Sequence, residues 1–592
     1  MRKVLVLSLG LFLLSLTASF SQGLMDYVKE VKGDTLVIKD YIDMGLQPNS
    51  LNNAVLGDSV NNPVPAGRVY QLQTNGWYPQ SAGLTTPSNR AVEISGADKT
   101  ILVNNNNAAT IPPIISGYND ESGSYVGGIT WGNDLTVKNI SQIIGSPDGV
   151  GGWAFYGTGA PDRRIVFDNC MMEHNWWVFI QSNGNPGNSF FITNSYFVNL
   201  SGRACRRNGG VYDNVNNNTD TMYVENNTHV MGQGMMYKFR NYPVEFIYFN
   251  HNTFVNCVGS TFETQGVQSK MIVTNNIFVN SNCQPFRPNM TEDLSEQDID
   301  NMPAGIINVA ALPATMDQVP RKFLVDKNVA YWDARLADLG TEANNLAING
   351  FTTWTKQSMT MNDRTQGFFN DNATYPFLTE GQWYDKLPSF ADTRDLLTAQ
   401  VDACKAFCLS TVDTTSTQVL APWRVVNATM PDDFIYSDWP IPIDLSYTDA
   451  DLLGTDGLPV GDLNWFPTQK ATYNANKATY YAALLDGLEN GHLVSDVEVI
   501  NSNIPETFEL SQNYPNPFNP ATVINFAVPK AGNVTLKVYN SLGQEVATLV
   551  NGYKEAQSYK VTFDASNLAS GVYIYKLESA NLSISKKMLL LK

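Results

Sequence analysis

The chain has 592 residues and a formal net charge of −18, from 56 acidic and 38 basic side chains. This length exceeds that of one compact domain, so several domains are expected. The acidic balance argues against nucleic acid as the partner, because a phosphate backbone binds basic surfaces.

Residues 1–21 have the pattern of a secretory signal peptide. Arg2 and Lys3 precede an apolar stretch from Val4 to Leu16, and Ser19–Ser21 resembles a small-residue cleavage site. No other apolar run approaches the roughly 18 residues that cross a bilayer. The sequence therefore predicts an exported protein without a transmembrane segment.

Export permits disulfides, and the chain has six cysteines. Cys404 and Cys408 lie one helical turn apart, where either a strained bridge or two buried free thiols would fit. Pairing among the others is open; they are Cys170, Cys205, Cys257 and Cys283.

Short alternating segments such as Thr35–Lys39 and Arg68–Leu72 predict an N-terminal cap and first strands over residues 22–90. From 91 to 335 the chain then follows a repeating pattern. Five similar segments end 25, 32, 25 and 24 residues apart, and each continues into two further short strands; they are Ile165–Asn169, Phe190–Asn194, Met222–Asn226, Ile247–His251 and Met271–Asn275.

A repeat of this period indicates stacked supersecondary units, and three strands per coil without a helical segment predict a parallel β-helix. Asn closes four of the five first strands, so ladders of Asn hydrogen bonds between coils are expected. One inward column should contain Met172, Phe197, His229, Phe254 and Phe278. The position of His229 in this column favours a core role over a catalytic one.

Residues 336–503 are predicted to form a capping region of loops and short helices. Thr393–Cys408 and Thr468–Glu489 have helical composition, while the chain between them resembles loop. Residues 504–592 contain evenly spaced strands separated by turns such as Asn567–Gly571, which predicts a β-sandwich. The expected fold class is therefore all-β, with a parallel β-helix solenoid, a mixed capping region and a terminal sandwich.

Four stretches of the terminal domain, about 85 residues in extent, carry a specific resemblance: Phe508–Pro520, Val538–Glu545, Leu568–Tyr573 and Lys586–Met588. They resemble the type A C-terminal sorting domain of the type IX secretion system. The resemblance implies passage through the periplasm, recognition by the type IX secretion machinery at the outer membrane, and often removal of the domain with attachment to the cell surface. Members commonly carry Gly-x-His near the fourth strand, where this chain has Gln557–Tyr559.

The coils resemble in architecture the pectate-lyase-like right-handed parallel β-helix superfamily. That fold carries polysaccharide lyases, hydrolases, esterases and non-catalytic binding modules. The resemblance therefore implies a fold, and the function must be argued from a site.

The third strands provide the candidate site. Aligned on Phe179, Cys205, Phe239, Phe262 and Phe286, they place the next residue of each coil on the outer face. Coils stack about 4.8 Å apart, so these side chains should form one charged patch with Lys238. Tyr237 and the Trp176–Trp177 pair are placed to stack on sugar rings. The charged members of the patch are Arg206, Arg240, Glu263 and Arg287.

Such a patch suits an acidic polysaccharide, because Arg pairs with carboxylates in bidentate fashion. The leading hypothesis is a surface protein that binds polysaccharide without a cofactor. The alternative is a polysaccharide lyase that cleaves uronate-containing glycans by β-elimination, with Lys238 or Arg240 as base and Arg206 or Arg287 neutralising the carboxylate. Calcium would enter only with the lyase. A plain surface ion-pair ladder is also open, as is a hydrolase using Asp168 and Asp213.

Overall fold

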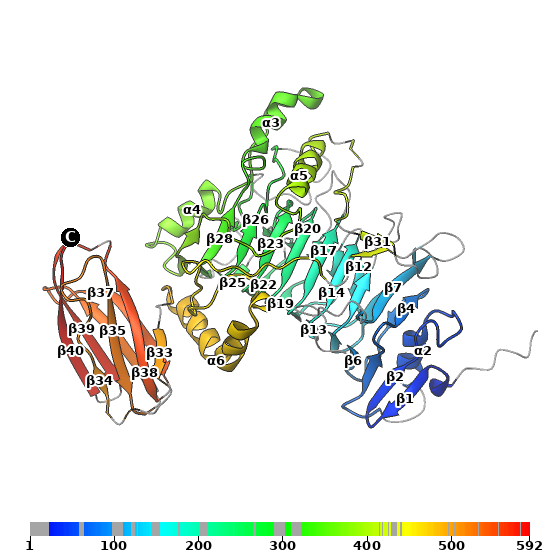
Figure 1. Ribbon diagram of the computed structural model, residues 1–592, viewed down its shortest axis with the longest axis horizontal. Helices are drawn as coiled ribbons and strands as arrows, with labels where there is room; N and C mark the ends of the chain where they lie inside the picture. Colours follow the sequence, from blue (N-terminus) through cyan, green and yellow to red (C-terminus); the bar gives the residue numbers. More distant parts are fainter. Residues whose placement is uncertain are drawn as a thin grey trace, which may run out of the picture.

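The computed structural model describes residues 23–58, 64–97, 111–119, 125–126, 128–143, 154–175, 178–201, 210–240, 242–264, 268–288, 302–309, 321–413, 415–416, 418–423, 425–427, 435–437, 441–494, 497–501, 505, 507–530, 532–554, 556–566, 568–579 and 582–592. Within these residues the chain forms a parallel β-helix, a C-terminal cap and a terminal β-sandwich (Figure 1).

The β-helix is built from three sheets whose neighbouring strands come from successive coils. The first sheet is parallel after an antiparallel β1–β2 pair; its strands are β1 (Val28–Lys32), β2 (Thr35–Ile38), β3 (Val69–Leu72), β6 (Val92–Gly96), β10 (Leu135–Lys138), β13 (Arg164–Asp168), β16 (Asn188–Thr193), β19 (Thr219–Glu225), β22 (Val244–Asn250), β25 (Gln268–Thr274), β27 (Lys322–Asp326) and β29 (Leu378–Glu380). The parallel stack thus begins at β2 and extends past residue 335.

The second sheet follows the first around the coil. Its strands are β4 (Trp77–Gln80), β7 (Ile114–Asn119), β11 (Ser141–Ile143), β14 (Met171–Asn175), β17 (Tyr196–Leu200), β20 (Thr228–Gly232), β23 (Thr253–Cys257), β26 (Ile277–Val279), β28 (Asn328–Tyr331) and β30 (Trp383–Tyr384), with β8 (Tyr125–Val126) antiparallel to β7. The third sheet contains β5 (Leu84–Thr85), β9 (Ile129–Trp131), β12 (Ala154–Thr158), β15 (Val178–Ser182), β18 (Gly210–Asn214), β21 (Tyr237–Phe239) and β24 (Phe262–Thr264).

The corner between the first and second sheets explains the recurring Asn. From β10 onward, the residue that follows a strand of the first sheet is repeatedly in the left-handed region, with φ of 53° at Asn169 and Asn194 and 54° at Asn226. Asn tolerates this conformation better than other side chains with a Cβ. His251 holds the equivalent position with φ of 53°. The recurring Asn in the sequence therefore reflects the left-handed backbone conformation at this corner.

The main hydrogen-bonded Asn ladder lies one residue further along, inside the helix. Asn227, Asn252, Asn276 and Asn328 are fully buried there. The Asn252 amide Nδ2 donates to Asn276 Oδ1 at 3.0 Å, and the Asn276 Nδ2 donates to Asn328 Oδ1 at 2.9 Å. Each side chain also binds backbone of a neighbouring coil, so the ladder satisfies buried polar groups at the corner.

The inward column of the second sheet is confirmed by the strand register, which pairs Met172 with Phe197, Phe197 with His229, and so on to Phe278. His229 stacks between Phe197 and Phe254, with ring centroids 4.6 and 4.2 Å apart. Burial lowers the pKa of His229 to about 3, so the ring is neutral. Its role as a core histidine is confirmed.

The alignment predicted for the third strands is wrong in three places. In the last coil, Phe286 forms an isolated bridge with Thr355 and belongs to no strand of the third sheet. In the 32-residue coil the strand of the third sheet is β18, and the predicted residues 204–207 lie outside the described part of the chain. In the next coil Tyr237 pairs with Phe262, while Phe239 pairs with Thr264. Tyr237 and Phe239 are two residues apart and both belong to the core, so the aromatic pattern allowed either register.

The capping region packs on the outer faces of the first two sheets. Its elements are α3 (Leu339–Leu346), η3 (Ile348–Gly350), α4 (Asp363–Asn370), α5 (Ala399–Ser410), the β31–β32 hairpin (Val425–Asn427 and Ile435–Ser437), η4 (Leu463–Trp465) and α6 (Pro467–Asn490). At the other end of the helix, η1 (Leu24–Asp26) and α2 (Ser50–Gly57) pack together. Apolar side chains of α5 and of residues 420–473 cover the second sheet, and Leu484 and Leu488 of α6 cover the first.

The terminal domain is a sandwich of two four-stranded sheets. One contains β33 (Val497–Asn501), β38 (Gln557–Asp564), β35 (Ala521–Val528) and β34 (Glu509–Leu510). The other contains β37 (Glu545–Lys554), β36 (Gly532–Tyr539), β39 (Gly571–Ser579) and β40 (Leu582–Leu590). In Figure 1 the sandwich lies beside α6.

The five cysteines in the described part of the chain are buried free thiols, including Cys404 and Cys408. Burial raises the pKa of the Cys170 and Cys257 thiols to about 12, which keeps them protonated and unreactive. Cys205 lies outside the described residues.

Candidate functional site

The outer face of the third sheet carries a column of polar side chains. The strand register aligns Gly157, Gln181, Asp213, Lys238 and Glu263 on successive coils. Their neighbours Tyr156, Ile180, Tyr212, Tyr237 and Phe262 belong to the core. Because successive strand residues point to opposite faces, the polar column faces outward. Lys238 is only 2% exposed, and the Glu263 side chain is outside the described part.

Arg240 joins this column through Asp213. Its Nε donates to Asp213 Oδ1 and its Nη2 to Asp213 Oδ2, both at 2.8 Å. The Asp213 side chain is 8% exposed and that of Arg240 is 21% exposed. This is the bidentate geometry in which a guanidinium also recognises the carboxylate of a ligand.

Arg287 lies in a different environment from the one predicted. The antiparallel bridge between Phe286 and Thr355 brings a cap segment onto the last coil. The Arg287 guanidinium consequently stacks 3.6 Å from the Phe351 ring centroid and 5.5 Å from that of Trp354. Covered in this way, Arg287 is a cation–π anchor for the cap and not part of an open charged patch.

Tyr237 is also misplaced by the sequence reasoning. It is fully buried, and its hydroxyl lies 2.9 Å from Nε2 of His229. Burial raises the pKa of this phenol well above its usual value. A side chain inside the helix has no face for a sugar ring. Arg206 and Trp177, like Trp176, lie outside the described residues, so their roles stay predictions.

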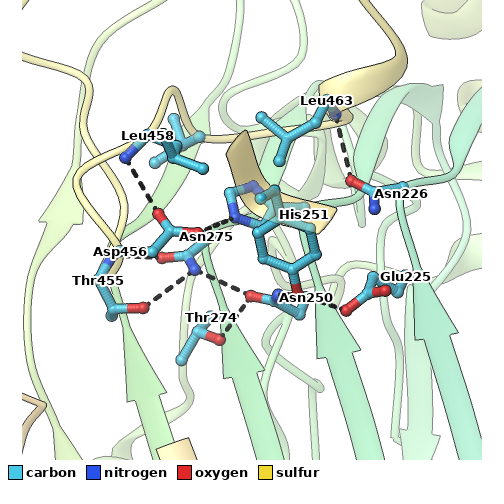
Figure 2. A network of polar contacts seen from close by, with 12 residues as sticks. Glu225, Asn226, Asn250, His251, Thr274, Asn275, Thr455, Asp456, Leu458 and Leu463 are labelled. Atoms are coloured by element: carbon cyan, nitrogen blue, oxygen red, sulfur yellow. Dashed lines mark hydrogen bonds and ion pairs between the residues drawn. The ribbon is translucent and has the colours of Figure 1, made fainter. Parts of the chain in front are cut away.

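A second polar cluster, missed in the sequence, lies where the cap crosses the corner between the first two sheets (Figure 2). His251 Nε2 is 2.8 Å from Asp456 Oδ2, and its Nδ1 is 3.1 Å from the Gly461 carbonyl oxygen. Burial acts to lower the pKa of His251, but the Asp456 carboxylate outweighs it and the pKa is raised. The only signal in the sequence was a His in the Asn column.

Glu225 anchors the same crossing from the end of β19. Its carboxylate accepts hydrogen bonds from the Tyr223 hydroxyl at 2.8 Å and the Tyr473 hydroxyl at 2.5 Å, and it pairs with Lys477. Glu225, His251 and the Asp456 side chain are each at most 2% exposed. The cluster is therefore closed to a polymer and serves to fix α6 and the segment before it.

In the described part of the chain, no three His, Cys, Asp or Glu side chains are grouped to hold a metal ion. The proposed hydrolase pair also separates, since Asp168 ends β13 of the first sheet and Asp213 belongs to β18 of the third. Of the two polar clusters, the one with Arg240 and Asp213 is thus the one that reaches solvent, through the 21% exposed side chain of Arg240.

Comparison with known families identifies the terminal domain. Residues 512–591 match the secretion-system C-terminal sorting domain, which confirms the resemblance seen in the sequence. The protein is exported to the cell surface by type IX secretion and engages that machinery through this domain. No curated protein matches this chain. None of the helices described here is long and apolar enough to span a membrane.

Proposed function

We propose that this cell-surface protein binds an acidic polysaccharide through the outer face of the third sheet, around Asp213, Lys238 and Arg240. The observation that supports this most is the distribution of the cap. Apolar cap side chains pack against the outer faces of the first and second sheets. The third sheet instead presents the Asp213–Arg240 pair, whose arginine side chain remains 21% exposed.

A contribution to folding stability does not by itself account for the Asp213–Arg240 pair. Removing two charges from water costs several kcal/mol per ion, and such pairs often add little net stability. Gln181, which is partly exposed one coil before Asp213, adds a hydrogen-bonding amide to this face. A linear chain of sugars running across the coils would meet these groups in turn.

The lyase alternative is less well supported. β-Elimination needs a base that reaches the proton beside the substrate carboxylate and a cation that neutralises that carboxylate. Lys238 is 2% exposed, and the fork of Arg240 is occupied by Asp213. Binding requires only that the fork become available, so a binding protein is the simpler proposal. A calcium ion is expected only if the protein is a lyase.

The test is retention on immobilised pectate, alginate and glycosaminoglycan. We expect Arg240→Gln to weaken binding of the retained polymer by about tenfold or more, since a bidentate charged contact is lost. Arg394→Gln is the matched control: this exposed cap arginine also pairs with an aspartate, Asp392. Equal retention of wild type and Arg240→Gln, with unchanged thermal unfolding, would exclude the proposed surface. Unsaturated uronate product, detected in the ultraviolet, would favour the lyase.

A further inference from the structure

The fork of Arg240 is already filled by a carboxylate from the protein itself. Asp213 receives one hydrogen bond from Nε and one from Nη2, each 2.8 Å long. A uronate residue of a polysaccharide would present the same chemical group in the same planar geometry. Asp213 therefore occupies the position that a ligand carboxylate would need.

Replacement of the Asp213 carboxylate by a ligand carboxylate would involve the Arg240 side chain and not the strands. Arg240 follows the end of β21, and Asp213 lies in β18 on the neighbouring coil. The Arg240 side chain is 21% exposed and that of Asp213 is 8% exposed, so the pair reaches solvent mainly through the arginine. A rotation of the arginine away from Asp213 would present the fork outward while the strands stay in place.

We propose that Asp213 is an internal competitor that reserves Arg240 for polymeric ligands. This inference rests on the proposed function. The aspartate competes at the high effective concentration of a tethered group, which a free uronic acid in solution does not match. A polyuronate chain makes several contacts at once and can displace it. Asp213 thereby sets selectivity for a polyuronate over its monosaccharide.

The experiment compares wild type with Asp213→Asn by calorimetric titration with polygalacturonate and with monomeric galacturonate. The variant keeps the side-chain shape but loses the competing charge. We expect about tenfold tighter binding of polygalacturonate and measurable binding of the monomer, which we expect wild type not to bind. Asp213→Glu retains a carboxylate and should behave like wild type.

Asp220→Asn controls for the change in overall charge. Asp220 is exposed on β19 of the first sheet, and its substitution also removes one negative charge. Its effect on binding should stay below about twofold, because exposed charges are screened. The double variant Asp213→Asn with Arg240→Gln should not show the tighter binding of polygalacturonate.

Tighter binding by Asp213→Asn, absent in the double variant, supports the proposal. Wild-type binding that Asp213→Asn leaves unchanged or weakens overturns the competitor role and leaves the binding surface intact. Absence of binding in wild type and in Asp213→Asn overturns both. Thermal unfolding verifies folding of each variant, and Asp213→Ser replaces Asp213→Asn if the latter unfolds.

Discussion

Replacing Asn252 with alanine is expected to lower the unfolding free energy of the β-helix by about 4 kcal/mol. The Asn252 side chain is fully buried in the internal ladder. Its Oδ1 accepts from both the backbone N–H and the Nδ2 of Asn227, and its Nδ2 donates to Asn276 and to the Val224 carbonyl. Alanine removes these four bonds in a site without bulk water. The Asn227 backbone N–H loses its acceptor, which costs about 1–3 kcal/mol, while Asn227 Nδ2 keeps the Ile192 carbonyl and Asn276 Oδ1 keeps the backbone N–H of residue 252. The other three lost bonds add about 1 kcal/mol each.

The measurement is urea unfolding followed by tryptophan fluorescence. Asn218→Ala is the control, because Asn218 is exposed in the turn before β19 and its loss should change stability by no more than about 0.5 kcal/mol. A cost below about 1 kcal/mol for Asn252→Ala would show that the ladder is not a main source of stability.

The second large effect is a loss of cap stability as the pH rises from about 4 to above 7. Burial raises the pKa of Asp462 from 3.8 to about 6, although the nearby Lys470 opposes the shift. The folded state therefore favours the protonated acid. The resulting stabilisation is complete below the unfolded value and is lost as the pH rises through about 6. A rise of this size corresponds to about 3 kcal/mol.

His251 extends the same trend to higher pH. Its pKa is raised above 6.5, because the Asp456 carboxylate outweighs the effect of burial. Its contribution is complete below 6.5 and is lost as the pH rises through the folded value. Glu489 changes the stability of the cap in the opposite direction. Bonds to Lys270 and Lys322 keep its pKa below 4.5, so its stabilising contribution is lost as the pH falls through the folded value. The most stable state of the cap is therefore expected near pH 4, where the Asp462 contribution is still largely present and that of Glu489 is not yet lost.

Two substitutions separate these contributions in urea unfolding at several pH values. Asp462→Asn should flatten the profile between about pH 4 and 6. His251→Asn should flatten it above 6.5, and asparagine suits the backbone because neighbouring coils carry it at this corner. Profiles that keep the wild-type slope in both variants would contradict the assignment of these two groups.

Most of the scaffold could be predicted from the sequence, because periodicity reports backbone geometry directly. The left-handed corner favours Asn on successive coils, although His251 and Lys327 also adopt it, and the inward stack is built from Phe197, Phe254 and their neighbours. Both signals repeat and both were found. The sorting domain was found from local motifs such as Phe508–Pro520, which need no knowledge of the tertiary fold.

The site was harder to predict because strand register decides it. The extra length of the 32-residue coil concealed β18, and with it the partner of Arg240. Asp213 entered the sequence analysis only as a hydrolase candidate. Contacts between residues far apart in the sequence could not be predicted either. Those of Arg287 with Phe351 and of His251 with Asp456 depend on how the cap folds back on the β-helix.

Hydrogen–deuterium exchange in the presence of polygalacturonate tests the binding surface most directly. Ligand should slow exchange in β18, which contains Asp213, and in β21, which Arg240 follows. Exchange in the cap-covered strands β20 and β23 should stay unchanged. Protection confined to the first or second sheet, or no protection at saturating polymer, would contradict the account.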